Sequence, residues 1–502
     1  METGMHHVQK MLLALLLLFT PFSGEQATHH HDAPEKLGTV SFPISCLPEA
    51  QQTFNRGVAL LHSFAYSAAR DAFHGVAEQD PRCAMAHWGI AMTYFHQLWE
   101  PPLPPGTMAT AQSEIQRAQQ APASTERERR YINALSLIYQ DADNVPYKSR
   151  ALNYERAMKD LAAADRQDAE AQVFYALALL ANISATDKKH ANQKAAADLL
   201  EPLYRACPQH PGIPHYLIHA YDNGELASRG LPAARAYSRI APSAPHALHM
   251  PSHIFTRLGL WEASIASNIA ARDAAHLQRD TGEELHAMDY LVYAYLQMGR
   301  DREAGRIVQQ LSEMSGLDTA DFKTGYAATA IPVRYAIERN QWADAARVVV
   351  PAGAPPHVAA IAVWARGLGL IRSERSAEAH LEVERLRKIG LQLRESDNGY
   401  WAAQVDIMVR EVMAWSDQAA GKPAEAVAMM SEAADEEDSM EKLPVTPGPI
   451  VPAREQLADL LLEQNQPAQA SQEFAIALAN APGRRAALQG AARAAELSRH
   501  SH

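Results

Sequence analysis

Cysteine is scarce in this chain, which has only three in 502 residues: Cys46, Cys83 and Cys207. Three cysteines cannot build the disulfide framework of a small secreted domain, and their spacing is not that of a zinc finger. At most one pair can bridge in an oxidising compartment, and Cys46 with Cys83 is one candidate. The sequence leaves that pairing open.

The chain also lacks an excess of basic charge. Lysine and arginine number 46 against 58 aspartates and glutamates, which gives a formal net charge of -12. Proteins that bind phosphate backbones usually carry a basic excess or a basic stripe. We therefore expect no nucleic acid among its partners. Hydrophobic residues make up 47% of the chain, so there is enough apolar surface for a core.

The apolar run Met11–Phe19 is too short to span a bilayer as a helix. Lys10 precedes it and small residues follow, which is typical of a secretory signal peptide. We expect residues 1–26 to be that peptide and residues 27–49 to be an N-terminal extension. We also expect a periplasmic or secreted protein with no membrane span in the mature chain. No cysteine closes the apolar run, which argues against a lipid anchor there.

A period of 34 residues organises the rest of the sequence. Counted from Ala50, the residues Gly57, Ala69, Phe73 and Pro81 occupy positions 8, 20, 24 and 32. This pattern resembles that of the tetratricopeptide repeat (TPR), a helical hairpin. Each residue type suits its place in such a hairpin. A small residue lets two helices approach, an aromatic ring fills the gap between them, and proline ends the second helix.

Five further strings are typical of the turn between paired helices. They are RLGLWEAS (257–264), QMGRDREA (297–304), ERNQWADA (338–345), AGKPAEA (420–426) and EQNQPAQA (463–470). The chain between them has a 3.6-residue periodicity and no strand-like alternation. We predict an all-α, right-handed solenoid of TPR-type hairpins over residues 50–500. Irregular inserts are expected at Pro101–Gly106, Asp141–Pro146 and Lys442–Pro449.

Histidine is unusually abundant, with 22 residues, and several recur in the repeat register. The pairs are His215 with His249 and His219 with His253, both 34 residues apart, and His246 with His286, 40 apart because of an insertion of six. These are the fifth, ninth and second positions of the first helix in each hairpin, so they share one face. In this fold that helix lines the concave groove, so we expect the imidazoles to point inward.

Imidazoles from neighbouring helices, which pack 8–10 Å apart as a rule, can reach a shared point. Such a set suits a transition metal ion, with zinc, copper or iron as the candidates. The predicted ligands, with the two aspartates either as ligands or as partners of ligands, are His215, His219, His246, His249, His253, His286, Asp222 and Asp289. The site would lie in the repeats at 211–300. If a helix begins at Pro251, His246 and His249 would lie on a preceding loop.

Two alternatives compete with a metal site: a polar groove for a carboxylate-bearing ligand, and a histidine cluster that only fills the core. Smaller candidates are a polar site around His62 and His96, with His74 and His87 nearby, and an inward-facing carboxylate at Glu455. If the site is catalytic, Asp222 or Asp289 is the candidate base, and Tyr221 or Tyr293 the candidate acid or anion stabiliser.

The strings HPGIPHYLIHAYD (210–222) and APHALHMPSHIFTRLGLWEAS (244–264) resemble a large bacterial family of exported TPR proteins. The segment PAREQLADLLLE (452–463) resembles that family's end, so the likeness covers most of the mature chain. Family members often carry HNxHF where this chain has HAMDY (286–290), so Asp289 replaces a histidine. The resemblance implies the fold and the site, and it leaves metal identity, nuclearity and reaction open.

Two functions follow as hypotheses. The first is an exported solenoid that binds a transition metal in its groove, with metalloenzyme activity left open. The second is a scaffold that captures a peptide or an envelope protein in the concave groove, where the histidines would donate hydrogen bonds to carboxylates.

Overall fold

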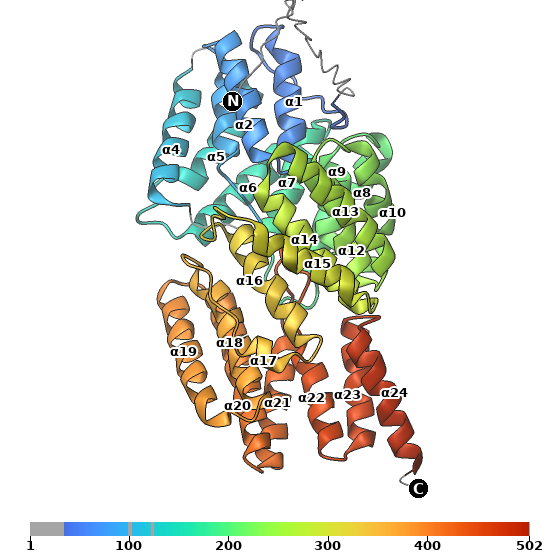
Figure 1. Cartoon of the computed structure of the whole chain (residues 1–502). Coiled ribbons are helices and arrows are strands. Elements are labelled where there is room, and N and C mark those ends of the chain that lie inside the picture. Colours follow the sequence, from blue (N-terminus) through green and yellow to red (C-terminus); the bar gives the residue numbers. More distant parts are fainter. Residues whose placement is uncertain (1–34, 99–102, 122–124, 501–502) are drawn as a thin grey trace, which may run out of the picture. The chain divides into compact units, whose positions relative to one another are not determined.

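A computed structural model describes residues 35–98, 103–121 and 125–500 of the chain. Lys36–His502 forms one compact unit. The predicted signal peptide and residues 27–34 of the predicted extension lie outside the described residues, as does part of the insert at Pro101–Gly106. The described residues form helices and no strand (Figure 1).

The helices follow one another as hairpins along the chain. Their bounds are α1 Ala50–His62, α2 Tyr66–Gln79, α3 Ala84–Met92, α4 Pro105–Gln120, α5 Glu126–Tyr139, α6 Tyr147–Ala164, α7 Ala169–Ala181, α8 Ala191–Ala206, α9 Gly212–Tyr221, the 3₁₀ helix η1 Ala227–Gly230, α10 Leu231–Ile240, α11 Pro245–His249, α12 Pro251–Arg257, α13 Trp261–Gln278, α14 Thr281–Gln297, α15 Asp301–Glu313, α16 Phe322–Ile337, α17 Trp342–Ala345, α18 Pro356–Arg372, α19 Ser376–Glu395, α20 Gly399–Ala419, α21 Pro423–Asp438, α22 Ala453–Glu463, α23 Pro467–Asn480 and α24 Arg485–His500.

This arrangement confirms the predicted all-α solenoid of TPR-type hairpins. Each of the five predicted turn strings falls between two paired helices. Gly259 and Gly299 lie in two of these turns with φ of +66° and +70°, a left-handed conformation that glycine adopts without a steric penalty. Asn340 and Asn465 occupy the equivalent place in two others, also with positive φ. The turn residues thus match what the backbone requires.

The 34-residue pattern is explained by the packing of Phe73. Its ring is fully buried between α1 and α3, against Gly57 and Gly89. A Cβ atom placed on Gly57 would lie 2.7 Å from the Phe73 ring, and one on Gly89 would lie closer still. Small residues are therefore needed on both neighbouring helices for the aromatic ring to fit.

A disulfide joins Cys46 to Cys83, which ties the segment before α1 to the start of α3. Cys207 is free and partly buried. In the part of the chain that the structure describes, no helix has both the length and the apolar character needed to cross a bilayer.

Candidate metal centre

The six candidate histidines come from four neighbouring helices and are almost fully buried. Helix α9 supplies His215 and His219, α11 supplies His246 and His249, α12 supplies His253 and α14 supplies His286. None of these side chains is more than 7% exposed. All ten residues of α9 are buried, so this helix can place polar rings inside the fold only if they find partners there.

Pro251 begins α12 directly after α11, and the residue between them stays helical. Met250, the residue between the two helices, keeps helical dihedral angles, with φ of -53° and ψ of -34°. Proline has no N–H, so the helical hydrogen bonding is interrupted there while the turn continues. His246 and His249 therefore lie on a short helix and not on a loop.

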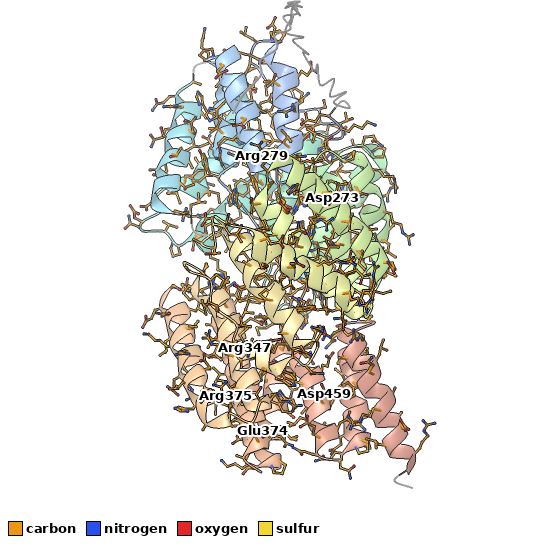
Figure 2. All side chains as sticks on the ribbon, viewed as in Figure 1. Asp273, Arg279, Arg347, Glu374, Arg375 and Asp459 are labelled. Carbon is orange, nitrogen blue, oxygen red and sulfur yellow. A yellow bond between two sulfur atoms is a disulfide. The ribbon has the colours of Figure 1, made fainter. Side chains whose placement is uncertain are left out.

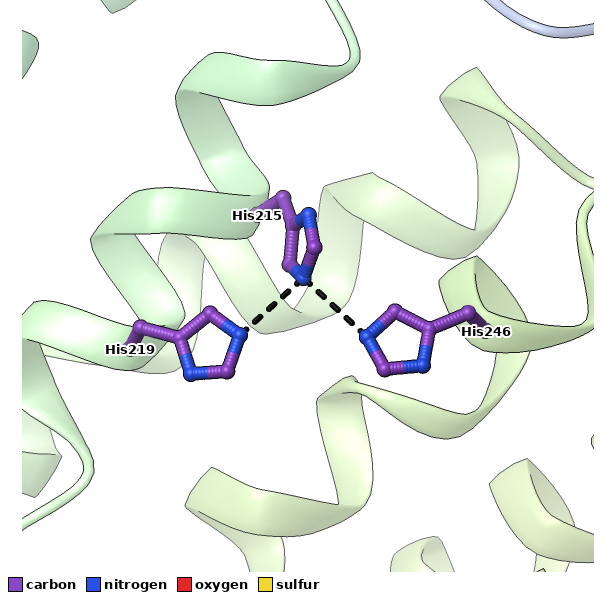
Figure 3. Close-up of side chains that lie close together, drawn as sticks. All are labelled: His215, His219 and His246. Atoms are coloured by element: carbon purple, nitrogen blue, oxygen red, sulfur yellow. Dashed lines mark hydrogen bonds between the residues drawn. The ribbon is translucent and has the colours of Figure 1, made fainter. Parts of the chain in front are cut away.

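The first group contains His215, His219 and His246 (Figure 3). The Nε2 atom of His215 lies 3.1 Å from Nε2 of His219 and 3.2 Å from Nε2 of His246. One nitrogen from each ring lies within 4.8 Å of the other two. We call this group triad 1.

The second group contains His249, His253 and His286, and we call it triad 2. The Nε2 atoms of His249 and His253 lie 3.0 Å apart, and the ring centroids of His249 and His286 lie 4.2 Å apart. One nitrogen from each of the three rings again lies within 4.8 Å of the others. The structure thus brings the six predicted histidines together as two sets of three.

The Nδ1 atoms of four of these rings contact atoms that act there as hydrogen-bond acceptors. The contacts are His215 to the His62 carbonyl at 2.6 Å, His246 to Glu283 Oε2 at 3.2 Å, His249 to Asn268 Oδ1 at 2.6 Å and His253 to Asp222 Oδ2 at 2.9 Å. The Asn268 amide is oriented by its own NH₂ group, which donates to the Ser264 carbonyl. Each Nδ1 must therefore carry the proton, which leaves a lone pair on Nε2 in the neutral ring.

This assignment makes lone pairs face each other inside both triads. His215 and His246 meet through two such Nε2 atoms, and so do His249 and His253. Facing lone pairs repel unless a proton or a cation lies between them. A tetrahedral zinc ion with Zn–N bonds of about 2.0–2.1 Å holds two ligand nitrogens about 3.3 Å apart, close to the separations seen here.

A proton is the less favourable solution because the surroundings resist it. Burial lowers the pKa of His215 well below its usual range, and the neighbouring His219 and His246 lower it further. Burial and the neighbours His286 and His253 do the same to the pKa of His249. Neutral imidazole, the form that binds metal ions, is therefore the stable form of His215 and His249.

Asp222 contacts a histidine but also neutralises two cations. Besides His253, its carboxylate contacts Arg257 at 2.9 Å and Lys442 at 2.7 Å. Burial raises the pKa of Asp222, but Lys442 and Arg257 outweigh it and hold that pKa well below its usual range. Asp222 therefore orients His253 from the Nδ1 side, and it belongs to neither group of three.

Glu283 has the same role for triad 1. It accepts a hydrogen bond from His246 and forms an ion pair with Lys323 at 2.6 Å. Although burial raises its pKa, the charges of Lys323 and His246 lower it well below the usual range.

A small cavity opens between the two triads. Its volume is about 10 Å³, close to what a single water molecule requires. Its walls are formed by both triads and by the segment between α21 and α22, and the lining residues are His219, His246, Met250, His253, His286, Lys323, Pro444 and Val445. The predicted insert at Lys442–Pro449 thus closes the histidine site.

Asp289 lies outside both triads, although it occupies the same repeat position as His215 and His249. Its buried carboxylate faces Arg334 of α16 at 3.4 Å, and it belongs to neither triad. The two candidate tyrosines also have other hydrogen-bond partners. The Tyr221 hydroxyl donates a hydrogen bond to Glu201, and the Tyr293 hydroxyl accepts one from Arg484. Tyr290 is the tyrosine beside the cluster, with its hydroxyl 3.4 Å from His253 Nε2.

The second predicted histidine site is not assembled as expected. His62 contacts Glu170 at 2.9 Å, and His210 contacts the other oxygen of the same carboxylate at 3.0 Å. His96 instead stacks on Tyr66, His87 contacts Glu114, and His74 is exposed. Glu455 is buried in an ion pair with Arg484 at 2.7 Å.

Sequence reasoning missed Asn268, Glu283, Lys323 and Lys442. Glu283 precedes His286 by one turn of α14, so its position on the inward face was detectable. Asn268 and Lys323 carried no comparable signal. Lys442 lies 220 residues from Asp222, and nothing in the repeat register links them.

No protein-family profile matches this sequence, and no curated protein matches it. Solved structures with a similar course of the chain include the TPR domain of P58(IPK), at 14% identity over 90% of this chain and 99% of that one, with a TM-score of 0.22. The Cut9–Hcn1 complex matches at 13% identity, with coverage of 83% and 76% and a TM-score of 0.36. Yeast Tom70 matches at 9% identity, with coverage of 91% and 90% and a TM-score of 0.33. Likeness at this level carries no argument about what the present chain binds.

Proposed function

We propose that this protein is an exported TPR-type solenoid that binds transition-metal ions, with zinc, copper or iron as the candidates, through the six histidines of triads 1 and 2. The observation that carries the proposal is the pair His249 and His253. Their Nε2 atoms lie 3.0 Å apart, while Asn268 and Asp222 hold both Nδ1 protons in place. A metal cation relieves this contact without protonating a buried ring.

The three histidines of each triad resemble the ligand set of a catalytic metal site. Three histidines leave a coordination position for a water molecule or a substrate, as in catalytic zinc sites, whereas structural sites are closed by four protein ligands. A bound ion would supply Lewis-acid or redox chemistry there. The protein's own contribution is to orient the rings, through the Asn268 amide, Asp222, Glu283 and the His62 carbonyl.

Export is part of the proposal. The disulfide between Cys46 and Cys83 supports it, because such bonds persist in oxidising compartments and are rare in the cytosol. The amino-terminal sequence pattern supports it independently.

Metal analysis of the purified full-length protein tests this function. We expect at least about one ion per chain after loading with Cu²⁺ or Zn²⁺ and gel filtration. The double substitution His219→Gln and His253→Gln removes one ligand from each triad and should abolish loading. The exposed His276 and His380 offer matched controls, since their replacement by glutamine should leave loading unchanged. Loading below about 0.2 ions per chain with every candidate metal would overturn the proposal.

A second candidate function, peptide binding, is favoured by a cavity of about 530 Å³ between the helices of the carboxyl-terminal hairpins. The guanidinium of Arg372 lies over the rings of both Trp342 and Trp415, at 5.3 and 4.6 Å, on one wall. Asp459 lines the same cavity from α22 (Figure 2), and burial together with Glu455 raises its pKa to about 7. Aromatic and charged groups of this kind could hold an extended chain segment.

The two candidates respond differently to substitution. Asp459→Asn should weaken capture of a peptide and leave metal loading unchanged, whereas the double histidine substitution should do the reverse. Metal loading should persist well below pH 6.5, because burial lowers the pKa of His253 to about 4 and keeps that ring neutral.

A further inference from the structure

We propose that triads 1 and 2 form one dinuclear centre, in which each triad holds one metal ion and the two ions share a small oxygen-donor ligand such as hydroxide. This inference rests on the proposed metal binding and goes beyond it, because it fixes the number of ions, the assignment of ligands and the class of the bridging ligand.

The donor atoms divide into two sets of three. Within each triad, one nitrogen per ring lies within 4.8 Å of the other two. Among the described residues, neither set gains a fourth histidine, cysteine or carboxylate at that distance. A single tetrahedral ion bound by four of the rings would need every pair of ligand nitrogens to lie about 3.3 Å apart. Rings of both triads would have to move to reach that arrangement. Two ions with three ligands each fit the rings as they stand.

The two triads are close enough to act together. His219 of triad 1 and His253 of triad 2 have ring centroids 6.1 Å apart, and the same distance separates His246 from His249. The cavity between the triads is lined by two histidines of each set. An ion in either triad therefore has its open coordination position toward the same small space, and two metal ions about 3.5–4 Å apart commonly share a bridging oxygen.

The charges around the site favour an anionic bridge. Lys323 neutralises Glu283, and Lys442 with Arg257 neutralises Asp222, so the carboxylates next to the histidines are already paired. Six neutral imidazoles would leave two divalent cations uncompensated in a buried site, which is costly. A hydroxide bound to both ions lowers that charge.

The size of the cavity limits the bridge to one or two heavy atoms. Its volume is about 10 Å³, and Met250, Pro444 and Val445 form apolar parts of its wall. Carboxylates, phosphates and peptide groups are larger than the single water molecule that this volume accommodates. Hydroxide, water and molecules of similar size fit as the structure stands.

Copper loading of the full-length protein provides the test. We expect about two Cu²⁺ per chain by elemental analysis, with most of the bound copper silent in electron paramagnetic resonance (EPR), because a shared oxygen couples the two unpaired spins. His215→Gln and, separately, His249→Gln each disable one triad. Each should lower the content to about one Cu²⁺ per chain and make that copper fully visible by EPR.

His190→Gln is the matched control, since His190 is a buried histidine that faces the carboxylate of Glu225 outside both triads. It should leave two spin-coupled copper ions. Circular dichroism of each variant reports whether it folds, and His219→Gln and His286→Gln provide second variants for the two triads.

The possible failures are distinguishable. One EPR-visible copper per chain in the unmodified protein would overturn the dinuclear centre and leave metal binding intact. Two coppers that are both fully visible by EPR would overturn the shared ligand. A protein that binds no copper, zinc or iron would overturn the proposed function itself.

Discussion

His249 and His253 point their Nε2 atoms at each other across 3.0 Å, while each ring donates its Nδ1 proton to a separate acceptor. The cluster around Glu170 shows the opposite solution. There, the carboxylate lies between His62 and His210 and accepts from both rings. In that cluster both rings contact a carboxylate, whereas the Nε2 atoms of His249 and His253 in triad 2 face each other directly. The two clusters thus differ in whether a carboxylate lies between the rings, and we propose that a cation takes that place in triad 2.

Asn268 is predicted to set metal affinity although it cannot reach the ion. Its amide oxygen accepts the Nδ1 proton of His249 at 2.6 Å and so holds Nε2 free for the metal. Asn268→Ala should weaken metal binding by about 10- to 100-fold, the usual effect of losing such a partner. Competition with a chromophoric chelator measures it. Asn133→Ala, at an exposed position of α5, is the control, and equal affinities for the two variants would contradict the prediction.

The stability of the metal-free protein should fall as pH drops from about 6.5 toward 4. Burial lowers the pKa of His253 to about 4, although Asp222 opposes that change. In this window the unfolded chain binds protons that the folded protein does not, so each such histidine removes up to about 1.4 kcal/mol of stability per pH unit. Asp222 and Glu283 have lowered pKa values, so their contribution is lost only at lower pH.

Thermal unfolding in the presence of a chelator, recorded at intervals of half a pH unit, measures this dependence. His253→Gln removes one of the responsible groups and should make the decline shallower. A midpoint that stays constant between pH 7 and 5 would show that these rings are protonated in the folded protein.

Asp222→Asn should be strongly destabilising. The carboxylate is buried between Arg257 and Lys442, and neutralising it removes the ion-pair partner of Lys442 and leaves Arg257 with Glu441 at 3.6 Å. Removal of one partner from a buried ion pair typically costs about 3–5 kcal/mol. Urea unfolding measures the loss. The exposed ion pair of Asp273 with Arg272 provides the control, because Asp273→Asn should change stability by less than about 1 kcal/mol. Adding Lys442→Met to Asp222→Asn should restore part of the loss.

The sequence predicts the hairpins and the face that carries the histidines for one physical reason. A repeat of fixed length returns the same position to the same side of the superhelix, so His215 and His249 had to lie on neighbouring inward faces. Register does not determine what a side chain meets there. Asp289 occupies the same position in the following repeat, yet α16 presents Arg334 to it, and the carboxylate pairs with that guanidinium.

The division into two triads and the closing segment were not predictable in the same way. The division depends on the orientation of each ring and on the junction of α11 and α12 at Met250 and Pro251, which the repeat register does not predict. The contact of Lys442 with Asp222 joins residues 220 positions apart. Such contacts arise from the packing of distant hairpins, and no local pattern encodes them.

The disulfide between Cys46 and Cys83 is predicted to be a major source of stability for the amino-terminal hairpins. It closes a loop with a sequence separation of 37, and the loss of chain entropy in the unfolded state for a loop of this length corresponds to about 4 kcal/mol. Cys46→Ser with Cys83→Ser should therefore lower the free energy of unfolding by about 2–4 kcal/mol in denaturant titrations. Cys207→Ser, which removes the free thiol, should change it by less than about 1 kcal/mol. The six histidines proposed to bind metal lie on α9, α11, α12 and α14, so the double serine variant should still load metal at low temperature. If it unfolds with the same midpoint as the unmodified protein, the bond contributes nothing to stability and the prediction is wrong.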